Sequence, residues 1–145
     1  MDPTVALLVI AALLVATLGA GLLLRRSRGR RRPVDAGEIV DPVPLGADGL
    51  GERATLLQFS TELCSRCPGM HRTLSAIAAG RPGVRHLDVD LTHRPDIAKQ
   101  FHVLQTPTTL LLDRDGRVRT RFGGVPGRDV LELELSRIAE EAPHG

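Results

Sequence analysis

The segment "TLLQFSTELCSRCPGM", residues 55–70, decides the fold of this 145-residue chain. Its first part, residues 55–60, is a short apolar run that predicts a buried β-strand. Residues 70–80 then space their apolar side chains by four and three and end in glycine, which predicts a helix and its stop. The only two cysteines of the chain, Cys64 and Cys67, therefore lie where a strand ends and a helix begins.

The sequence after this segment alternates between strand and helix patterns. The expected elements are a strand at 84–90, a short helix at 95–103, a strand at 108–113, a turn at 113–116, an edge strand at 117–122 and a helix at 128–142. The order β-α-β-α-β-β-α predicts an α/β fold with a mixed sheet and helices on both faces. We expect the first three strands to be parallel, with right-handed crossovers, and the last two to be antiparallel.

The position of the two cysteines favours redox chemistry. A thiol at a helix N-terminus lies near unpaired backbone N–H groups and the positive end of the helix dipole, which stabilise the nucleophilic thiolate. Arg66, between the two cysteines, adds positive charge, so we expect it to tune the thiol pKa. The two-residue spacer allows the second thiol to attack once the first has formed a mixed disulfide.

Other roles for the cysteine pair are less well supported. A structural zinc site needs four ligands, and the candidates besides the cysteines are scattered histidines. These are His71, His86, His93 and His102. A metal shared between two chains and delivery of copper(I) by the two thiols stay open as alternatives. An inert structural bridge is unexpected, because so short a loop constrains little of the unfolded chain.

Three motifs together resemble the thioredoxin family over about residues 54–142. They are "LLQFSTELCSRC", "LDVD" and "LQTPTTLLLDRDGRV" followed by "FGG". The resemblance implies that Cys64 is the attacking thiolate and Cys67 the resolving thiol. It also implies that Thr106–Pro107 is a cis peptide beside the cysteines and that the backbone of Thr106 pairs with substrate. Without the resemblance, Pro107 could be an ordinary trans residue that opens a strand.

The sequence departs from the family pattern around the cysteines. Leu63 and Ser60 replace family aromatics, and Ser65–Arg66 replaces the Gly–Pro between the cysteines. Gln58 stands where the family has a buried acid that helps to deprotonate the resolving cysteine, and glutamine cannot take a proton at physiological pH. His86 lies near the position of a family lysine, where it is either a substitute base or an ordinary strand histidine.

The N-terminal segment "VALLVIAALLVATLGAGLLL", residues 5–24, contains no charge and no proline. At about 1.5 Å per residue it reaches roughly 30 Å, the thickness of the hydrocarbon core of a bilayer. A cleaved signal peptide would have a basic start, a shorter apolar core and a small-residue cleavage site. A buried helix of a soluble protein is rarely apolar all round. The segment therefore predicts one transmembrane helix.

The flanks of this helix predict its orientation. Six arginines follow it within "RRSRGRRR", residues 25–32, and no basic residue precedes it. Because basic flanks stay in the cytoplasm, we expect the C-terminal domain on the cytoplasmic face, with residues 5–32 in contact with lipid. The extracytoplasmic face is the alternative. A nucleic-acid arm is disfavoured because the run abuts a membrane span, and residues 33–145 carry a net charge of −3.

Composition completes the domain plan. Residues 33–53 hold three prolines and four glycines without sustained periodicity, which is typical of a linker. We therefore expect a membrane helix with its basic flank at 1–32, this linker, and a thioredoxin-like domain at 54–145. All but one of the nineteen basic residues are arginine, which indicates a bacterial genome of high GC content.

These observations predict a membrane-anchored thiol–disulfide oxidoreductase that uses Cys64 and Cys67. No cofactor or metal is expected. The partners would be a disulfide-containing protein, an electron donor of unknown identity and membrane lipid, but not nucleic acid. A non-catalytic thioredoxin-like module that binds a partner at the membrane is the alternative, favoured by the missing acid and aromatics but not by the intact cysteine pair.

Overall fold

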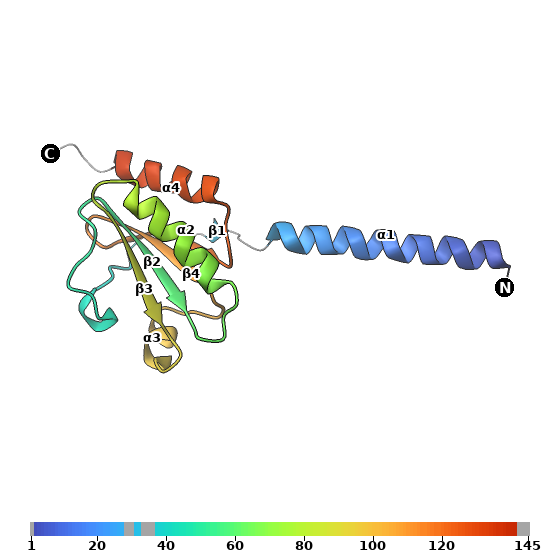
Figure 1. Ribbon diagram of the computed structural model, residues 1–145, viewed down its shortest axis with the longest axis horizontal. Coiled ribbons are helices and arrows are strands. Elements are labelled where there is room, and N and C mark those ends of the chain that lie inside the picture. Colours follow the sequence, from blue (N-terminus) through green and yellow to red (C-terminus); the bar gives the residue numbers. More distant parts are fainter. Residues whose placement is uncertain (1, 28–30, 33–36, 142–145) are drawn as a thin grey trace.

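The computed structural model describes residues 2–27, 31–32 and 37–141 and contains one mixed α/β domain with a separate N-terminal helix (Figure 1). The elements are α1 (Pro3–Ser27), β1 (Arg31–Arg32), the 3-10 helix η1 (Val43–Leu45), β2 (Ala54–Ser60), α2 (Cys67–Ala79), β3 (Val84–Asp90), α3 (Pro95–Gln100), β4 (Thr108–Asp113), β5 (Val118–Gly123) and α4 (Arg128–Glu141). The predicted order of strands and helices from β2 to α4 is confirmed.

The strands form one sheet in the order β1-β5-β4-β2-β3. β2 is parallel to β3, with Leu57 opposite Leu87, and antiparallel to β4. β5 is antiparallel to both β4 and the two-residue β1. The sheet is therefore mixed, as predicted, with β4 at its centre and β2 between β4 and the edge strand β3.

The expectation that the first three strands are all parallel was wrong, because β4 runs antiparallel to β2. The physical reason is the length of α3, which ends at Gln100 rather than near residue 103. A helix of six residues rises about 9 Å. The seven residues of β3 extend about 23 Å. A helix this short cannot return the chain along the whole sheet, so β4 starts at the end where β3 stops.

Each face of the sheet has its own hydrophobic core. On one face, α2 and α4 pack side by side over the strands (Figure 1). The buried side chains there are Ala54, Leu56, Met70, Leu74, Ile77, Leu111, Phe122, Leu131, Leu135 and Ile138. On the other face lie α3 and the segment before β2. The buried side chains on that face are Val40, Leu57, Phe59, Val89, Leu91, Ile97, Phe101, Leu110, Leu112 and Val118.

The segment that precedes β2 is attached to the domain. Ile39 forms an isolated bridge with Arg117, and the Val40 N–H donates to the Gly116 carbonyl over 2.9 Å. The Val40 side chain is only 2% exposed and belongs to the core on the α3 face. Part of the segment expected to be a linker thus packs against the domain that follows it.

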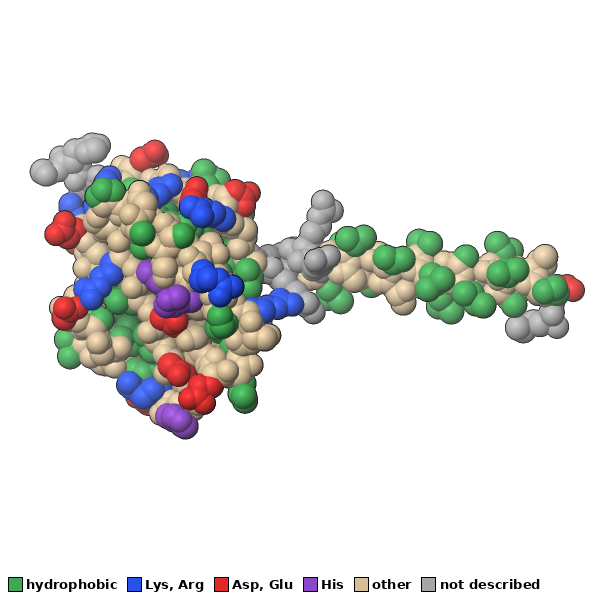
Figure 2. All heavy atoms as spheres, viewed as in Figure 1, with side chains coloured by type: hydrophobic (Ala, Val, Ile, Leu, Met, Phe, Trp, Pro, Cys, Tyr) green, Lys and Arg blue, Asp and Glu red, His purple; other side chains and the backbone are tan. Residues whose placement is uncertain are grey.

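Helix α1 lies apart from the domain. It is long and apolar enough over Pro3–Leu24 to cross a membrane, and none of that stretch is buried. Figure 2 shows hydrophobic side chains along the visible side of α1, whereas acidic and basic side chains alternate over the domain. A helix that exposes leucine and valine in this way needs an apolar environment around it.

Candidate active site

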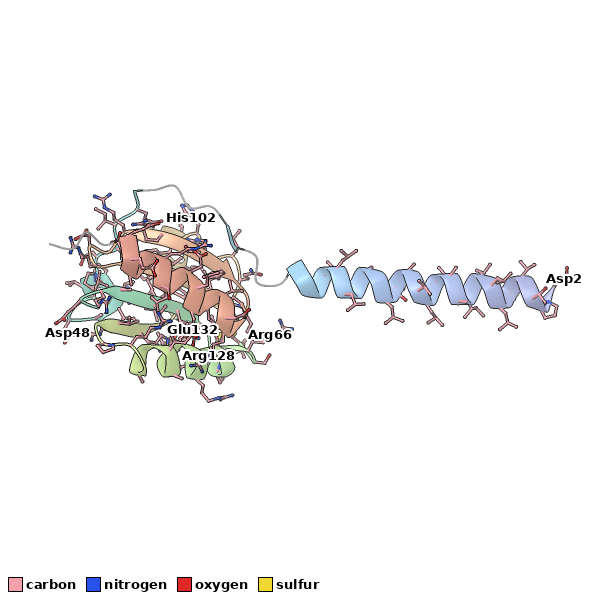
Figure 3. The ribbon with its side chains drawn as sticks, turned by 90° about the horizontal axis from the view of Figure 1, so that it is seen from above. Asp2, Asp48, Arg66, His102, Arg128 and Glu132 are labelled. Atoms are coloured by element: carbon pink, nitrogen blue, oxygen red, sulfur yellow. A yellow bond between two sulfur atoms is a disulfide. The ribbon has the colours of Figure 1, made fainter. Side chains whose placement is uncertain are left out.

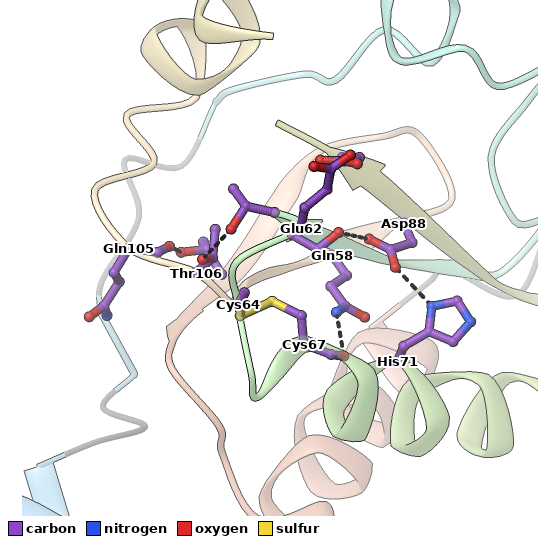
Figure 4. The surroundings of a disulfide bond; sticks show 12 residues. Gln58, Glu62, Cys64, Cys67, His71, Asp88, Gln105 and Thr106 are labelled. Atoms are coloured by element: carbon purple, nitrogen blue, oxygen red, sulfur yellow. Dashed lines mark hydrogen bonds and ion pairs between the residues drawn. A yellow bond between two sulfur atoms is a disulfide. The ribbon is translucent and has the colours of Figure 1, made fainter. Parts of the chain in front are cut away.

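The loop between β2 and α2 carries both cysteines. β2 ends at Ser60, six loop residues follow, and α2 begins at Cys67. Cys64 and Cys67 form a disulfide with their Cα atoms 5.4 Å apart (Figure 4). The Cys64 N–H donates to the Thr61 carbonyl over 3.1 Å, and the Cys67 N–H donates to the Cys64 carbonyl over 3.2 Å. These two turns place the sulfur atoms at the start of the helix.

The two cysteines differ in exposure. Cys64 is partly exposed, whereas Cys67 is only 4% exposed and packs with the first turn of α2. A thiolate must be reachable to attack a disulfide in another protein, and a protected thiol can act only within the same chain. The geometry therefore allows an intermolecular reaction at Cys64 and an intramolecular one at Cys67.

The loop before β4 lies against the cysteine loop. The Thr106–Pro107 peptide bond is cis. The Thr106 and Thr61 hydroxyl oxygens are 3.3 Å apart, and the Gly124 N–H donates to the Pro107 carbonyl over 2.8 Å. A depression of about 560 Å³ joins the two loops. Its lining residues are Thr61, Leu63, Cys64, Ser65, Arg66 and Thr106.

The structure thus brings together most of the residues expected at the site. Cys64, Arg66 and Thr106 share this depression, while Cys67 and Pro107 are buried beside it. Arg66 is exposed at the end of the domain nearest α1, and Asp48 lies at the opposite end (Figure 3).

Gln58 lies in the interior directly behind Cys67. It is fully buried, its side-chain amide donates to the Cys67 carbonyl over 3.2 Å, and its oxygen lies 3.2 Å from Nε2 of His86. Because that oxygen needs a donor, His86 carries its proton on Nε2, and Nδ1 accepts from the Ser75 hydroxyl at 2.9 Å. Gln58, His86 and Ser75 thus form a continuous row of hydrogen-bonded side chains.

His86 is a structural residue of this network rather than a substitute base. Burial and, to a smaller extent, the nearby His71 lower its pKa from 6.5 to about 4, against the opposing effect of Asp88. Both ring nitrogens are occupied by hydrogen bonds. Of the two roles considered from the sequence, the structure therefore supports the strand histidine.

A second groove, of about 430 Å³, lies on the other side of the cysteines. Its lining residues are Ser60, Thr61, Glu62, Cys64, Cys67, Pro68, His71, Arg72, Asp88 and Asp90. Nδ1 of His71 lies 2.8 Å from one carboxylate oxygen of Asp88, and the Ser60 hydroxyl donates to the other over 2.6 Å (Figure 4). In the part of the chain that the structure describes, no three His, Cys, Asp or Glu side chains gather as a metal site.

Sequence reasoning did not assign a role to the Ser60–Asp88–His71 chain. His71 was considered only as a zinc ligand, and Asp88 only as a strand residue. The available signal was positional: His86 and Asp88 alternate onto the strand face that meets α2, and His71 follows Cys67 by one helical turn. Polar residues on two facing apolar surfaces are uncommon and indicate a contact between them.

The thioredoxin family model matches residues 49–137, which include the cysteine loop, the cis-proline loop and most of α4. The chain belongs to the thioredoxin family. It is 35% identical over 91 residues to a thioredoxin of Chlamydia trachomatis, covering 63% of this chain and 88% of that one. It is 33% identical over 93 residues to a thioredoxin of Mycolicibacterium smegmatis, covering 61% of this chain and 82% of that one.

Solved structures of thioredoxins share the fold. The oxidised mitochondrial thioredoxin 3 of Saccharomyces cerevisiae superposes with a TM-score of 0.52 at 27% identity, covering 59% of this chain and 79% of that one. Family membership and the cysteine pair at disulfide distance make this thioredoxin-family chain a thiol–disulfide oxidoreductase. Members of the family act on disulfide-containing substrates together with a reductant.

Proposed function

We propose that this thioredoxin-family protein is a membrane-anchored thiol–disulfide oxidoreductase whose Cys-Ser-Arg-Cys motif exchanges disulfides with a partner protein. The observation that carries the proposal is the unequal exposure of the two cysteines at the β2–α2 junction. Cys64 is within reach of another protein, and Cys67 is within reach of Cys64 alone.

The proposed cycle transfers two electrons. The Cys64 thiolate attacks a disulfide of the partner, which forms a mixed disulfide and releases one partner thiolate. Cys67 then loses its proton and attacks Cys64, which forms the Cys64–Cys67 disulfide and releases the second partner thiolate. The partner is reduced to two thiols, and a separate electron donor, whose identity is unknown, reduces the protein again.

Three neighbouring residues would support this cycle. The backbone of Thr106, held by the cis bond to Pro107, would pair with the substrate chain in the depression that it shares with Cys64. The positive charge of Arg66 would favour the Cys64 thiolate. Leu63, which is 97% exposed at the same depression, would add an apolar contact to the partner.

The N-terminal region would hold the enzyme at the membrane. We propose that α1 spans the bilayer, that residues 5–32 contact lipid, and that residues 54–145 work on the cytoplasmic side as the thioredoxin-like domain. The length and apolar surface of α1 support a membrane span. The six arginines that follow the span support a cytoplasmic location of the domain. Residues 33–53 would join the two parts.

A matched pair of cysteine variants tests the chemistry. The full-length protein in detergent should accelerate reduction of a disulfide-bonded protein such as insulin by dithiothreitol, and Cys64→Ala should fall to the rate of dithiothreitol alone. Cys67→Ala should instead accumulate a mixed disulfide with its substrate, visible on a non-reducing gel. A Cys64→Ala protein with full activity, or a Cys67→Ala protein that traps nothing, would contradict the proposal.

A further inference from the structure

The groove of about 430 Å³ holds both cysteines and a hydrogen-bonded chain that the cycle described so far does not use. The chain runs from the Ser60 hydroxyl to the Asp88 carboxylate over 2.6 Å and from that carboxylate to His71 over 2.8 Å. It joins the end of β2, the middle of β3 and the second turn of α2. The side chain of His71 is 49% exposed and that of Asp88 is 27% exposed, so both contact solvent in the groove.

Resolution of the mixed disulfide requires a proton acceptor at this place. Cys67 must become a thiolate before it attacks Cys64, and burial disfavours the charged thiolate. The nearest buried polar side chain is Gln58, whose amide cannot accept a proton at physiological pH. The next, His86, uses both ring nitrogens in hydrogen bonds. The proton must therefore leave towards the groove.

We propose that the Asp88–His71 pair accepts the Cys67 proton through water in the groove, with Ser60 fixing the orientation of the carboxylate. The inference rests on the proposed function, because it concerns the second step of the disulfide exchange. The S–H bond of Cys67 breaks, the proton moves to the pair, and the Cys67 thiolate forms the bond to Cys64. The departing partner thiolate finally takes up a proton, so the pair returns to its starting state.

The surroundings of the pair suit this role. The titratable and charged groups facing it are Glu62 and Cys64 from the loop, Cys67 and Arg72 from α2, and His86, Asp88 and Asp90 from β3. Hydrogen bonds from Thr92 lower the pKa of Asp90, so that this carboxyl remains negative. Negative charges at Asp90 and Glu62 favour the arrival of a proton in the groove. The positive charge of Arg72 opposes it, but this side chain is exposed on the solvent side of α2, where water weakens its effect.

The two steps can be measured separately with one probe, the aromatic disulfide DTNB. Attack by Cys64 releases a first coloured thiolate at a rate that depends on DTNB concentration. Attack by Cys67 on the resulting mixed disulfide releases a second coloured thiolate at a rate that is independent of DTNB concentration. Stopped-flow absorbance of the reduced full-length protein in detergent, repeated across pH, gives both rates for the wild type, His71→Asn and Asp88→Asn.

We expect both variants to slow the second phase at least about 100-fold at about pH 7 and to leave the first phase unchanged. Their second phase should recover towards the wild-type rate at about pH 10, where hydroxide removes the Cys67 proton directly. The matched controls His102→Asn and Asp48→Asn should match the wild type throughout. His102 is exposed on a loop after α3, and Asp48 lies at the far end of the domain (Figure 3).

The possible failures have different signatures. A wild type that releases no second thiolate would overturn the proposed function itself. The absorbance trace of Cys67→Ala, which can release only the first thiolate, serves as the reference for that outcome. A normal wild type whose second phase is unchanged in both variants would overturn only the role of the pair. A purely structural role is recognised by a second phase that is equally slow at every pH, or by a first phase that slows as well, and either result overturns the proposal.

Discussion

Gln58 occupies a fully buried position behind the cysteines with a neutral amide. A carboxylate there would need a cation or a proton, whereas the amide is satisfied on both sides by the Cys67 carbonyl and by His86. Burial, with a smaller effect of His71, lowers the pKa of His86 and keeps the ring neutral, and its Nδ1 accepts from the Ser75 hydroxyl. The hydrogen-bonded chain of Gln58, His86 and Ser75 behind the dithiol is therefore polar and uncharged.

Neutral burial of His86 makes the domain sensitive to acid. Because burial lowers the folded-state pKa from 6.5 to about 4, the unfolded chain binds the proton more tightly, and stability falls as the pH decreases from 6.5 to 4. A pKa change of this size corresponds to about 3 kcal/mol, which solvent access at this half-buried site reduces to about 1–2 kcal/mol. Urea unfolding at several pH values should show this loss in the wild type and a smaller one in His86→Gln.

A second histidine provides the control for this measurement. His93 is exposed in the loop after β3, so His93→Gln should keep the full pH dependence of the wild type. If the free energy of unfolding fell equally with decreasing pH in His86→Gln and the wild type between pH 6.5 and 4, the pKa of His86 would not be lowered by folding.

At this scale the sequence was informative where residue type and spacing suffice. The spacing of Cys64 and Cys67 after an apolar run indicated their junction, whereas the cis bond at Thr106–Pro107 that the structure contains was implied by the resemblance to the thioredoxin family. The positions of His71 and Asp88 on facing surfaces of α2 and β3 were the available signal for a contact between them. Their hydrogen bond itself could not be predicted, because it depends on how closely α2 packs on β3.

The elements follow their apolar patterns closely. β4 is buried along its whole length, β5 alternates buried and exposed residues, and α4 buries one stripe. Strand and helix identities could therefore be read from periodicity alone. The direction of β4 could not be predicted from periodicity, because it depends on the length of α3. The sequence gives little indication of where so short a helix ends.

Two leucines of α4 test how the helix packs. Leu135 is fully buried between α4 and the sheet, whereas Leu133 on the same helix is 54% exposed. Leu135→Ala should lower the free energy of unfolding by about 2–5 kcal/mol, since it leaves a cavity in the core. Leu133→Ala should change it by less than about 0.5 kcal/mol. Urea titration of both variants measures the difference, and similar losses at the two positions would contradict the packing of α4.

The whole molecule combines an acidic domain with a basic N-terminal region that contains a long apolar helix. This asymmetry, and the apolar surface of α1, are properties of composition and were visible in the sequence. The attachment of the segment around Val40 to the domain could not be predicted from the sequence. Two prolines and two glycines between residues 41 and 50 leave no periodic apolar pattern that would indicate packing.

The side of the membrane can be tested with the native cysteines, since the chain contains no others. After reduction of the Cys64–Cys67 disulfide and removal of the reductant, a membrane-impermeant maleimide should leave the wild type unlabelled in intact cells and label it after permeabilisation, because the arginine flank predicts a cytoplasmic domain. The reciprocal control removes both cysteines and adds Asp2→Cys at the N-terminus, which should label in intact cells. Labelling of the wild type without permeabilisation would place the domain outside.

The pairing of β1 with β5 determines where the segment after α1 meets the domain. Arg31 lies opposite Phe122, next to the Gly123 end of β5 that pairs with the start of β4 beside Pro107. Three residues separate Ser27 from Arg31, a distance of at most about 14 Å. With α1 in the bilayer, the end of the domain that carries Arg66 and the depression it shares with Cys64 would lie towards the lipid headgroups. The enzyme would then select disulfides by their height above the bilayer, and loops of neighbouring integral proteins would be reduced before those of freely diffusing ones.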